Sequence, residues 1–156
     1  MKSPVRLLLV LALAAALVAQ VLRARDLMRA QAILRNVEAR SAELARAGSA
    51  DSRLLRAHLL ALEEAARLDR AEVGIPIARG NQFLLLGAYD SAIEAYRSAQ
   101  RLERRPETHL NLAEALLRSG RRDEALAEIA LVLRLDPILA ERVPESLKEE
   151  IRARAK

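Results

Sequence analysis

With 156 residues the chain has about the length of a single domain. It is 52% hydrophobic but only 2% aromatic, so its core must consist mainly of leucine and alanine, which favour helices over strands. The absence of cysteine excludes disulfide bonds, thiolate metal sites and a lipid-modified N-terminal cysteine. The net charge of +5 comes mainly from arginines scattered among acidic residues, without the basic and aromatic clusters of nucleic-acid-binding proteins. We therefore expect an all-α protein that does not bind nucleic acid.

An apolar segment near the N-terminus has the composition of a membrane helix. Uncharged residues run from Leu7 to Leu22 between Arg6 and Arg23. Such a segment is either a membrane anchor or the apolar region of a signal peptide. As a helix it covers about 24 Å of a hydrocarbon core of about 30 Å, and the flanking arginines can reach the interface. Because the small residues suited to cleavage lie inside the apolar run, we interpret residues 1–22 as a transmembrane helix that contacts the membrane through residues 5–22.

The charges on the two sides of this segment nearly balance. Lys2 and Arg6 favour a cytoplasmic N-terminus, which would place the rest of the chain across the membrane. Arg23, Arg25 and Arg29 favour the opposite orientation. The charge rule therefore leaves the orientation open.

Residues 23–72 are expected to form a helical hairpin. Its first helix, to Ala47, carries inward positions spaced by three and four: Leu27, Ala30, Leu34, Val37, Ser41 and Leu44. A turn at 48–50 and a cap at Asp51 or Ser52 precede a second helix. Its apolar face is expected to carry Leu55, Leu59, Leu62 and Ala66, flanked by Leu54, Leu60 and Leu68. We interpret the pair as covering the open end of the helices that follow. The alternatives are a degenerate repeat and a dimerising coiled coil, which a stripe of only three heptads does not favour.

The next block repeats itself at a step of thirty-three residues. Gly80, Phe83, Gly87, Ala92, Tyr96, Ala99 and Leu102 return as Ala113, Leu116, Gly120, Ala125, Ile129, Val132 and Leu135. A period of this length in helix-forming sequence predicts a solenoid of helix pairs. Gly87 and Gly120 stand where the chain must reverse, and Asp90 and Asp123 are expected to cap the helices that follow. Two unrelated helix pairs with coincidental spacing are the alternative.

This block resembles the tetratricopeptide repeat. The second copy is the closer match and ends in Leu135-Asp136-Pro137, although His109 replaces the family's tryptophan. The first copy has Pro76 at its tryptophan position and Arg104 in place of the closing proline. The resemblance covers residues 73–139 as two repeats, and it implies an αα solenoid that binds other proteins. Residues 140–156 are expected to add a capping helix, from Glu145 to Ala155, whose acidic start and basic end suit the helix dipole.

No catalytic pattern is present in the sequence. His58 and His109 are the only histidines, and each falls within an expected helix, where packing is the simpler role. Neither a glycine-rich phosphate loop nor a spacing typical of metal ligands occurs. We therefore predict a non-enzyme with no cofactor, metal or small-molecule substrate.

The resemblance also implies a binding surface. In this family the first helix of each pair lines a concave groove, where asparagines can hydrogen-bond a peptide backbone. The groove residues expected here are Ile77, Asn81, Leu84, Leu85, Leu110, Asn111, Glu114, Leu117 and Arg118. Ile77 and Leu110 replace lysines with which family members clamp a terminal carboxylate, so an apolar helix or extended peptide is favoured over an acidic one. Simple solvent exposure of the two asparagines is the alternative.

Two functions are compatible with this sequence. The first is a non-catalytic adaptor or scaffold, tethered to the membrane, which acts as an accessory or assembly subunit of a bacterial membrane or envelope complex. The alternative is a chaperone-like periplasmic module that binds peptides or proteins reversibly in its groove. The resemblance to bacterial envelope proteins with one N-terminal helix favours a single-pass protein of the inner membrane with periplasmic repeats.

Overall fold

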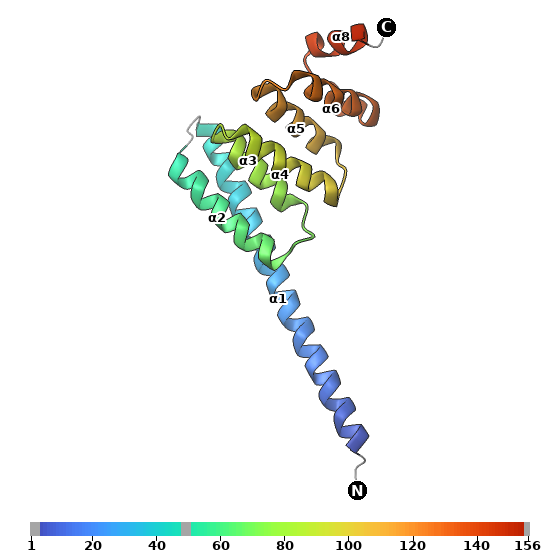
Figure 1. The fold of residues 1–156 in the computed structure, drawn as a ribbon. Coiled ribbons are helices and arrows are strands. Elements are labelled where there is room, and N and C mark those ends of the chain that lie inside the picture. Colours follow the sequence, from blue (N-terminus) through green and yellow to red (C-terminus); the bar gives the residue numbers. More distant parts are fainter. Residues whose placement is uncertain (1–3, 48–50, 155–156) are drawn as a thin grey trace.

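The computed structural model describes residues 4–47 and 51–154, and within these ranges the chain is helical, with no strand. The all-α prediction is therefore confirmed. Figure 1 shows the arrangement of the elements. The helices are α1 (Pro4–Ala47), α2 (Ser52–Leu68), α3 (Gly74–Leu85), α4 (Tyr89–Leu102), α5 (Pro106–Arg118), α6 (Arg122–Leu135), α7 (Pro137–Ala140) and α8 (Glu145–Arg154). The short α7, which Asp136 caps through Ile138 and Leu139, was not expected from the sequence.

The helices stack as consecutive pairs. Within each pair, α1 packs against α2, α3 against α4 and α5 against α6, and neighbouring pairs meet through α2 with α3 and α4 with α5. Helix α1 also contacts α3, and α8 packs beside α6 at the C-terminal end. The result is a short solenoid in which α1, α3 and α5 are the first helices of successive pairs, and α8 follows at the C-terminal end.

Two groups of buried side chains hold the solenoid together. The first surrounds Tyr96, which is fully buried among residues of α4, α5 and α6. The second joins α1, α2 and α3: Ala30, Leu34, Val37, Leu62, Ala65, Ile75 and Ala78. The predicted inward stripe of α1 is therefore covered by helices of the same chain, because α2 and α3 bury its central residues.

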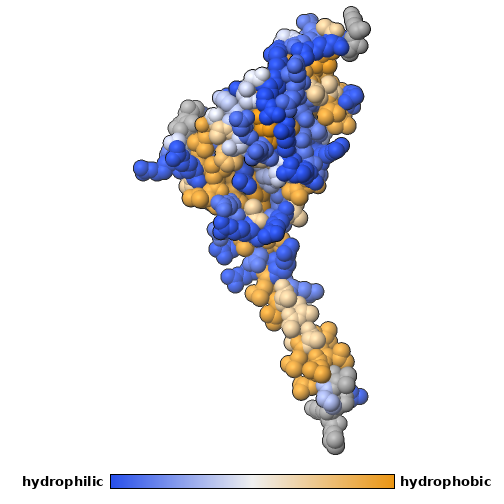
Figure 2. All heavy atoms as spheres, in the orientation of Figure 1, coloured by the Kyte–Doolittle hydropathy of each residue, from blue (hydrophilic) through white to orange (hydrophobic). Residues whose placement is uncertain are grey.

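Helix α1 is one continuous element rather than an anchor followed by a separate hairpin helix (Figure 1). Its N-terminal part projects from the solenoid, and the side chains from Leu7 to Leu22 are exposed. Figure 2 shows mainly apolar residues around this projecting part. The helix is long and apolar enough to cross a membrane, a property that signal sequences near the N-terminus share.

Helix ends and faces differ in detail from the expectations. Asp51 caps α2 by accepting from the amides of Arg53, at 2.9 Å, and Leu54, at 3.4 Å. Asp90 and Asp123 lie in the first turns of α4 and α6 and do not cap them. The reason is that Gly87 and Gly120, with φ of 73° and 81°, reverse the chain so sharply that each new helix begins before its aspartate. Leu60 is 69% exposed, because the buried face of α2 runs instead through Leu55, His58, Leu62 and Ala65.

Some expectations concern residues outside the described ranges. These are the turn at residues 48–50, the charge of Lys2 and the end of the last helix at Ala155. The described part of that last helix begins at Glu145, as expected.

Candidate functional site

Two hollows lie along the side of the solenoid formed by the first helices of the layers. The α1–α3 hollow has a volume of about 400 Å³ and is lined by Val37, Glu38, Ser41, Ala42, Ala78, Asn81, Gln82, Leu84 and Leu85. The α5–α8 hollow has a volume of about 300 Å³ and is lined by Leu110, Ala113, Glu114, Leu117, Ile129, Arg142, Val143, Pro144 and Leu147. Both combine apolar side chains with a few polar groups, as binding sites for peptides do.

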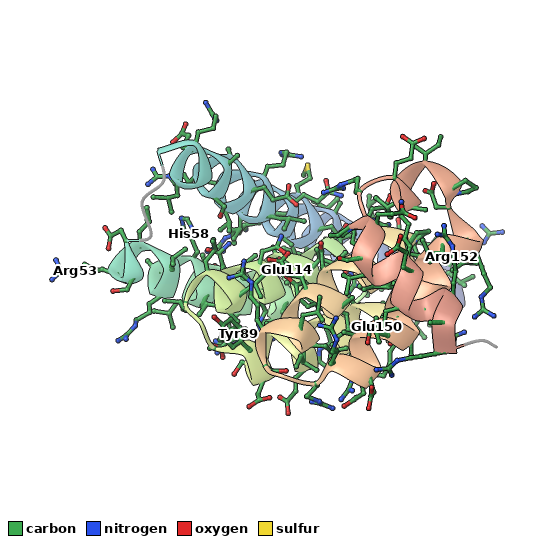
Figure 3. The ribbon with its side chains drawn as sticks, turned by 90° about the horizontal axis from the view of Figure 1, so that it is seen from above. Arg53, His58, Tyr89, Glu114, Glu150 and Arg152 are labelled. Atoms are coloured by element: carbon green, nitrogen blue, oxygen red, sulfur yellow. The ribbon has the colours of Figure 1, made fainter. Side chains whose placement is uncertain are left out.

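Buried Tyr96 interacts with one lining residue of each hollow. Its hydroxyl donates a hydrogen bond of 2.7 Å to Asn81 Oδ1, which lines the α1–α3 hollow. Burial and the nearby charge of Glu114, which lines the α5–α8 hollow, both raise the pKa of Tyr96. The buried hydroxyl therefore bonds a residue of the first hollow and is influenced by the charge of a residue of the second. In Figure 3, Glu114 lies near the middle of the molecule, between α1 and α8.

The structure brings together six of the nine predicted groove residues. Asn81, Leu84 and Leu85 line the first hollow, and Leu110, Glu114 and Leu117 line the second. The other three line neither hollow: Ile77 packs against the core around Tyr96, Asn111 is half-buried, and Arg118 pairs with the lining residue Glu114 at 2.9 Å. Whether this surface binds a partner remains a prediction.

Sequence reasoning missed the contribution of α1 to the first hollow. Val37, Glu38, Ser41 and Ala42 form its wall opposite α3. The inward stripe already placed Val37 and Ser41 toward the rest of the chain, but no sequence signal stated that α3 would be their neighbour. The C-terminal wall of the second hollow, from Arg142 to Leu147, was missed for the same reason.

A chain of buried and half-buried polar groups holds the base of the first hollow. Gln82 Nε2 donates to Ser41 Oγ at 2.9 Å, and Ser41 Oγ donates to the carbonyl of Val37 at 2.7 Å. His58 Nδ1 lies 3.1 Å from Gln82 Oε1, so the arrangement favours the tautomer in which Nδ1 donates. These contacts join α1, α2 and α3. His58 therefore has the packing role expected of it, and Gln82, which the sequence did not single out, is its partner.

His109 belongs to a second polar group, which joins α4, α5 and α6. Its Nδ1 lies 2.6 Å from Glu128 Oε2 and 2.9 Å from Gln100 Nε2. Gln100 Nε2 also donates to Glu128 Oε2 at 3.2 Å. His109 is 6% exposed and replaces the family's tryptophan with a hydrogen-bonded side chain. Among the described residues no group of three histidines, aspartates or glutamates has the arrangement of a metal site.

Glu38 is the only charged residue that lines the α1–α3 hollow. Partial burial, followed by the charge of Glu72, raises the pKa of Glu38. In the described ranges no basic side chain forms an ion pair with this carboxylate. The first hollow therefore presents an uncompensated acidic group.

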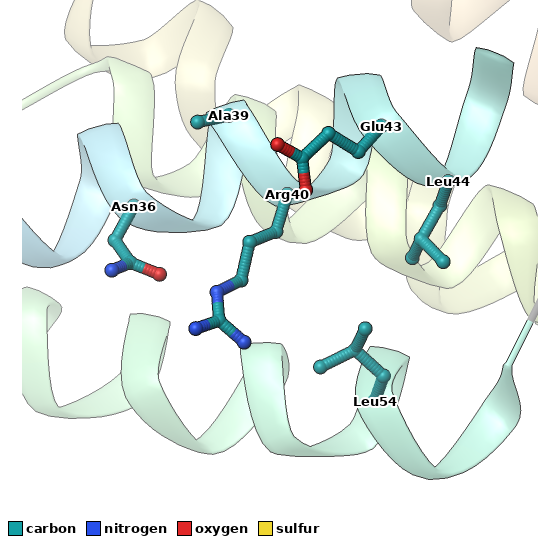
Figure 4. A pocket seen from close by; sticks show the side chains of 6 residues that line it. All are labelled: Asn36, Ala39, Arg40, Glu43, Leu44 and Leu54. Carbon is teal, nitrogen blue, oxygen red and sulfur yellow. The ribbon is translucent and has the colours of Figure 1, made fainter. Parts of the chain in front are cut away.

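A further hollow lies between α1 and α2, away from the predicted groove. Its volume is about 470 Å³, and its lining residues are Asn36, Ala39, Arg40, Glu43, Leu44 and Leu54. Figure 4 shows the guanidinium of Arg40 extending from α1 toward α2. Sequence reasoning did not anticipate this surface.

The comparison with family models identifies the repeat. Residues 83–137 match the model described as tetratricopeptide repeat. Residues 83–137 are therefore tetratricopeptide repeat sequence. The match begins in α3 and ends at the first residue of α7, so it contains the α4–α5 packing described above. No curated protein matches the sequence.

Solved structures agree with this assignment. A thermophilic tetratricopeptide repeat protein of Thermus thermophilus is 32% identical, with a TM-score of 0.52 over 64% of this chain. The present chain covers 48% of that protein, about half its length. The type III secretion translocator chaperone SycD of Yersinia enterocolitica is 21% identical, with a TM-score of 0.60 over 79% of this chain and 94% of its own. A second SycD structure, in complex with a peptide of the translocator YopD, gives the same identity and TM-score over 79% and 95%. The likeness to SycD shows a shared fold.

Proposed function

We propose that this tetratricopeptide repeat protein is a membrane-tethered adaptor without catalytic activity, an accessory or assembly subunit of a bacterial membrane or envelope complex. The observation that carries this proposal is the continuity of α1. One helix contains the exposed apolar segment from Leu7 to Leu22 and also supplies Val37, Glu38 and Ser41 to the α1–α3 hollow. The proposed anchor and the groove wall therefore belong to one continuous helix.

This continuity would hold the groove at a set height above the membrane. Glu38 lies sixteen positions after Leu22, which corresponds to about 24 Å of α-helix. A partner bound in the groove would then lie near the membrane surface, within reach of other membrane-bound subunits. A flexible linker would not impose this height, because its ends sample many separations.

The site itself supports binding rather than chemistry. The two hollows are lined mainly by leucine, alanine and valine, with amides and a few charged groups. Among their described lining residues, no nucleophile lies next to a histidine or another general base in the arrangement that covalent catalysis needs. A solenoid of this kind presents an extended surface to partners. We place the protein in the inner membrane with its repeats in the periplasm, on the resemblance to envelope proteins of this type.

A second candidate function is a chaperone-like periplasmic module that binds its partners reversibly. What favours it is the SycD structure, which shares this fold and contains a bound translocator peptide. The two hollows with Asn81 between apolar side chains would suit an extended peptide. In this case the N-terminal segment would act as a signal sequence.

Purification of the tagged full-length chain in mild detergent distinguishes the two functions. The adaptor predicts a stoichiometric set of co-purifying subunits and an intact N-terminus by protein sequencing. The chaperone-like module predicts a protein that purifies alone, begins near Leu17 or Gln20 and captures peptides. A mature protein lacking residues 1–19 would overturn the membrane tether.

A further inference from the structure

We propose that the α1–α3 hollow selects a peptide carrying a lysine or arginine, whose cation pairs with Glu38 while a neighbouring backbone carbonyl accepts a hydrogen bond from Asn81. This inference rests on the proposed function of the groove as a protein-binding surface. It adds the chemistry of the residue that the groove prefers, which the family resemblance does not specify.

Tyr96 fixes the orientation of the Asn81 amide. The Tyr96 hydroxyl donates to Asn81 Oδ1 at 2.7 Å, so the carbonyl end of this amide is already engaged. The two N–H groups of Nδ2 are left to donate to a ligand. Because Tyr96 is fully buried, the hydroxyl that orients this amide is itself held in place by packing. Asn81 therefore presents a donor to the hollow, which matches the carbonyl oxygen of a peptide.

The α1–α3 hollow carries a negative charge. Glu38 is its single charged lining residue, and its other lining residues are apolar or neutral polar. Glu72, whose charge acts on Glu38, has the same sign. On the neighbouring α5, the cation of Arg118 is already paired with Glu114. Although the whole chain carries a net charge of +5, this hollow is locally acidic and lacks its counterion among the described residues.

Apolar side chains lie in the hollow together with the carboxylate of Glu38. Leu84 and Leu85 of α3, the latter 45% exposed, lie in the same hollow as the carboxylate. Lysine and arginine have long apolar stems that pack on such side chains while the charged end reaches a polar group. A basic residue therefore packs its stem on the leucines and pairs its cation with Glu38. A purely apolar residue makes only the first of these contacts, and an acidic residue cannot make the ion pair.

The test uses the full-length protein in a zwitterionic detergent and three fluorescein-labelled peptides that differ only at a central lysine, glutamine or glutamate between leucines. Fluorescence anisotropy measures each Kd. The lysine peptide should bind about fivefold more tightly than the glutamine peptide, as expected for a partly exposed ion pair, and the glutamate peptide should bind most weakly. In Glu38→Gln the lysine advantage should disappear. Glu43→Gln, on the same helix but lining the α1–α2 hollow, should retain it.

Tyr96→Phe provides an independent check on the orientation of Asn81. It should weaken the binding of all three peptides by a similar factor, because the amide of Asn81 is no longer held in its orientation. Asn81→Ala should then cost less binding in the Tyr96→Phe background than in the wild type, because the donor that it deletes is already poorly oriented. Circular dichroism confirms that each variant is folded. Equal binding of the three peptides would overturn the role of Glu38 but leave the groove intact as a binding site. Tighter binding of the glutamate peptide would overturn the proposed pairing of Glu38 with a cation and would indicate an acidic partner. Absence of binding by all three would overturn the groove as a peptide site as well.

Discussion

At the scale of single residues, Gly80 packs closely against Tyr96, whose hydroxyl holds the groove residue Asn81. A Cβ added at Gly80 would lie 2.4 Å from Tyr96 Cε1, closer than real carbon atoms approach. Tyr96 occupies this space because Gly80 has no side chain, and the ring then reaches Asn81 with its hydroxyl. The small residue predicted by the repeat is therefore what allows a buried aromatic residue to lie directly under the groove.

We expect Gly80→Ala to lower the free energy of unfolding by about 1–3 kcal/mol, the usual cost of forcing extra atoms into a packed core. The gain in helix propensity, about 1 kcal/mol, offsets only part of the clash. Urea denaturation followed by circular dichroism measures the change. Gly74→Ala is the comparison, because its Cβ would meet one methyl group of Leu34, at 2.8 Å, and the carboxylate of Glu72, at 3.2 Å, rather than several atoms of a fully buried ring. Equal effects of the two variants would contradict the argument.

The raised pKa of Glu38 makes stability depend on pH. In the folded state Glu38 holds its proton more strongly than in the unfolded chain, because partial burial and Glu72 disfavour its charge. As the pH rises above the ordinary value of 4.5, the unfolded state therefore loses this proton first, and stability falls through the window up to the folded pKa. Above that window the loss is complete.

Glu38→Gln should therefore raise the melting temperature at pH 7, where the wild-type carboxylate is charged. Well below pH 4 the difference should vanish, because both side chains are then neutral. Thermal unfolding at a series of pH values tests this, with Glu43→Gln as the control for loss of a surface charge on α1. A variant that is less stable at pH 7 would show that Glu38 forms a favourable contact in the free protein.

Gln82 supports the groove from within, and its removal should be costly. Gln82→Ala leaves the buried His58 Nδ1 without its partner and removes the hydrogen bond that Ser41 Oγ accepts, although Ser41 Oγ still donates to Val37. We expect a loss of about 1–3 kcal/mol in the free energy of unfolding for each polar group left unsatisfied, offset where water enters. Chemical denaturation measures the loss. Gln31→Ala, at an exposed position of α1, should change stability by less than about 0.5 kcal/mol.

At the scale of elements, α8 completes the solenoid. Leu147 and Ile151 pack on the core, and Arg122–Glu150 and Arg154–Asp123 ion pairs hold α8 beside α6. These ion pairs are exposed, so they contribute little stability, and the apolar contact is the larger effect. The helix covers the open edge that the last repeat would otherwise expose, as terminal helices of solenoids do.

Leu147→Ala should lower the free energy of unfolding by about 1–2 kcal/mol, less than the roughly 2–5 kcal/mol of a fully buried leucine because Leu147 is half-buried. It should also weaken the binding of any ligand to the α5–α8 hollow, which Leu147 lines. Denaturation and the peptide anisotropy assay read the two effects separately. Ile138→Ala is the matched control, since Ile138 is 81% exposed. If both variants behaved alike, α8 would not be docked in solution.

At the scale of the whole molecule, the decisive feature is helix α1, which is exposed in its first part and packed in the solenoid in its second. The part of α1 from Leu7 to Leu22 is exposed along its whole length, whereas Ala30, Leu34 and Val37 are buried in the solenoid. The apolar segment therefore contributes nothing to the folded core. Its exposed leucines are compatible with a lipid environment or with a signal segment.

If the segment is a membrane anchor, full-length protein should stay in the membrane fraction after carbonate extraction. Replacing Leu11 and Leu17 with arginine should release it, because each charge near the bilayer centre costs about 2.5–3.5 kcal/mol. Met28→Arg, at an exposed position beyond the segment, should remain in the membrane. Release of the unmodified protein would contradict the anchor.

Much of the fold was predictable because it depends on local periodicity. The thirty-three-residue step located the helix pairs, the spacing of Ala30, Leu34 and Val37 identified the buried face of α1, and Gly87 and Gly120 marked the reversals. These features depend on residues within a few turns of one another. The sequence by itself therefore determined a helical repeat protein with an apolar N-terminal segment.

The binding surface was only partly predictable, because it depends on which helices become neighbours. Asn81 was expected in a groove, but its contact with Tyr96 spans 15 residues, and the contact of Gln82 with Ser41 spans 41. Only the stacking of α3 on α1 brings Glu38 opposite Asn81 and Leu84. Tertiary structure therefore decided the composition and charge of the groove, since side chains distant in sequence meet only after the helices have packed.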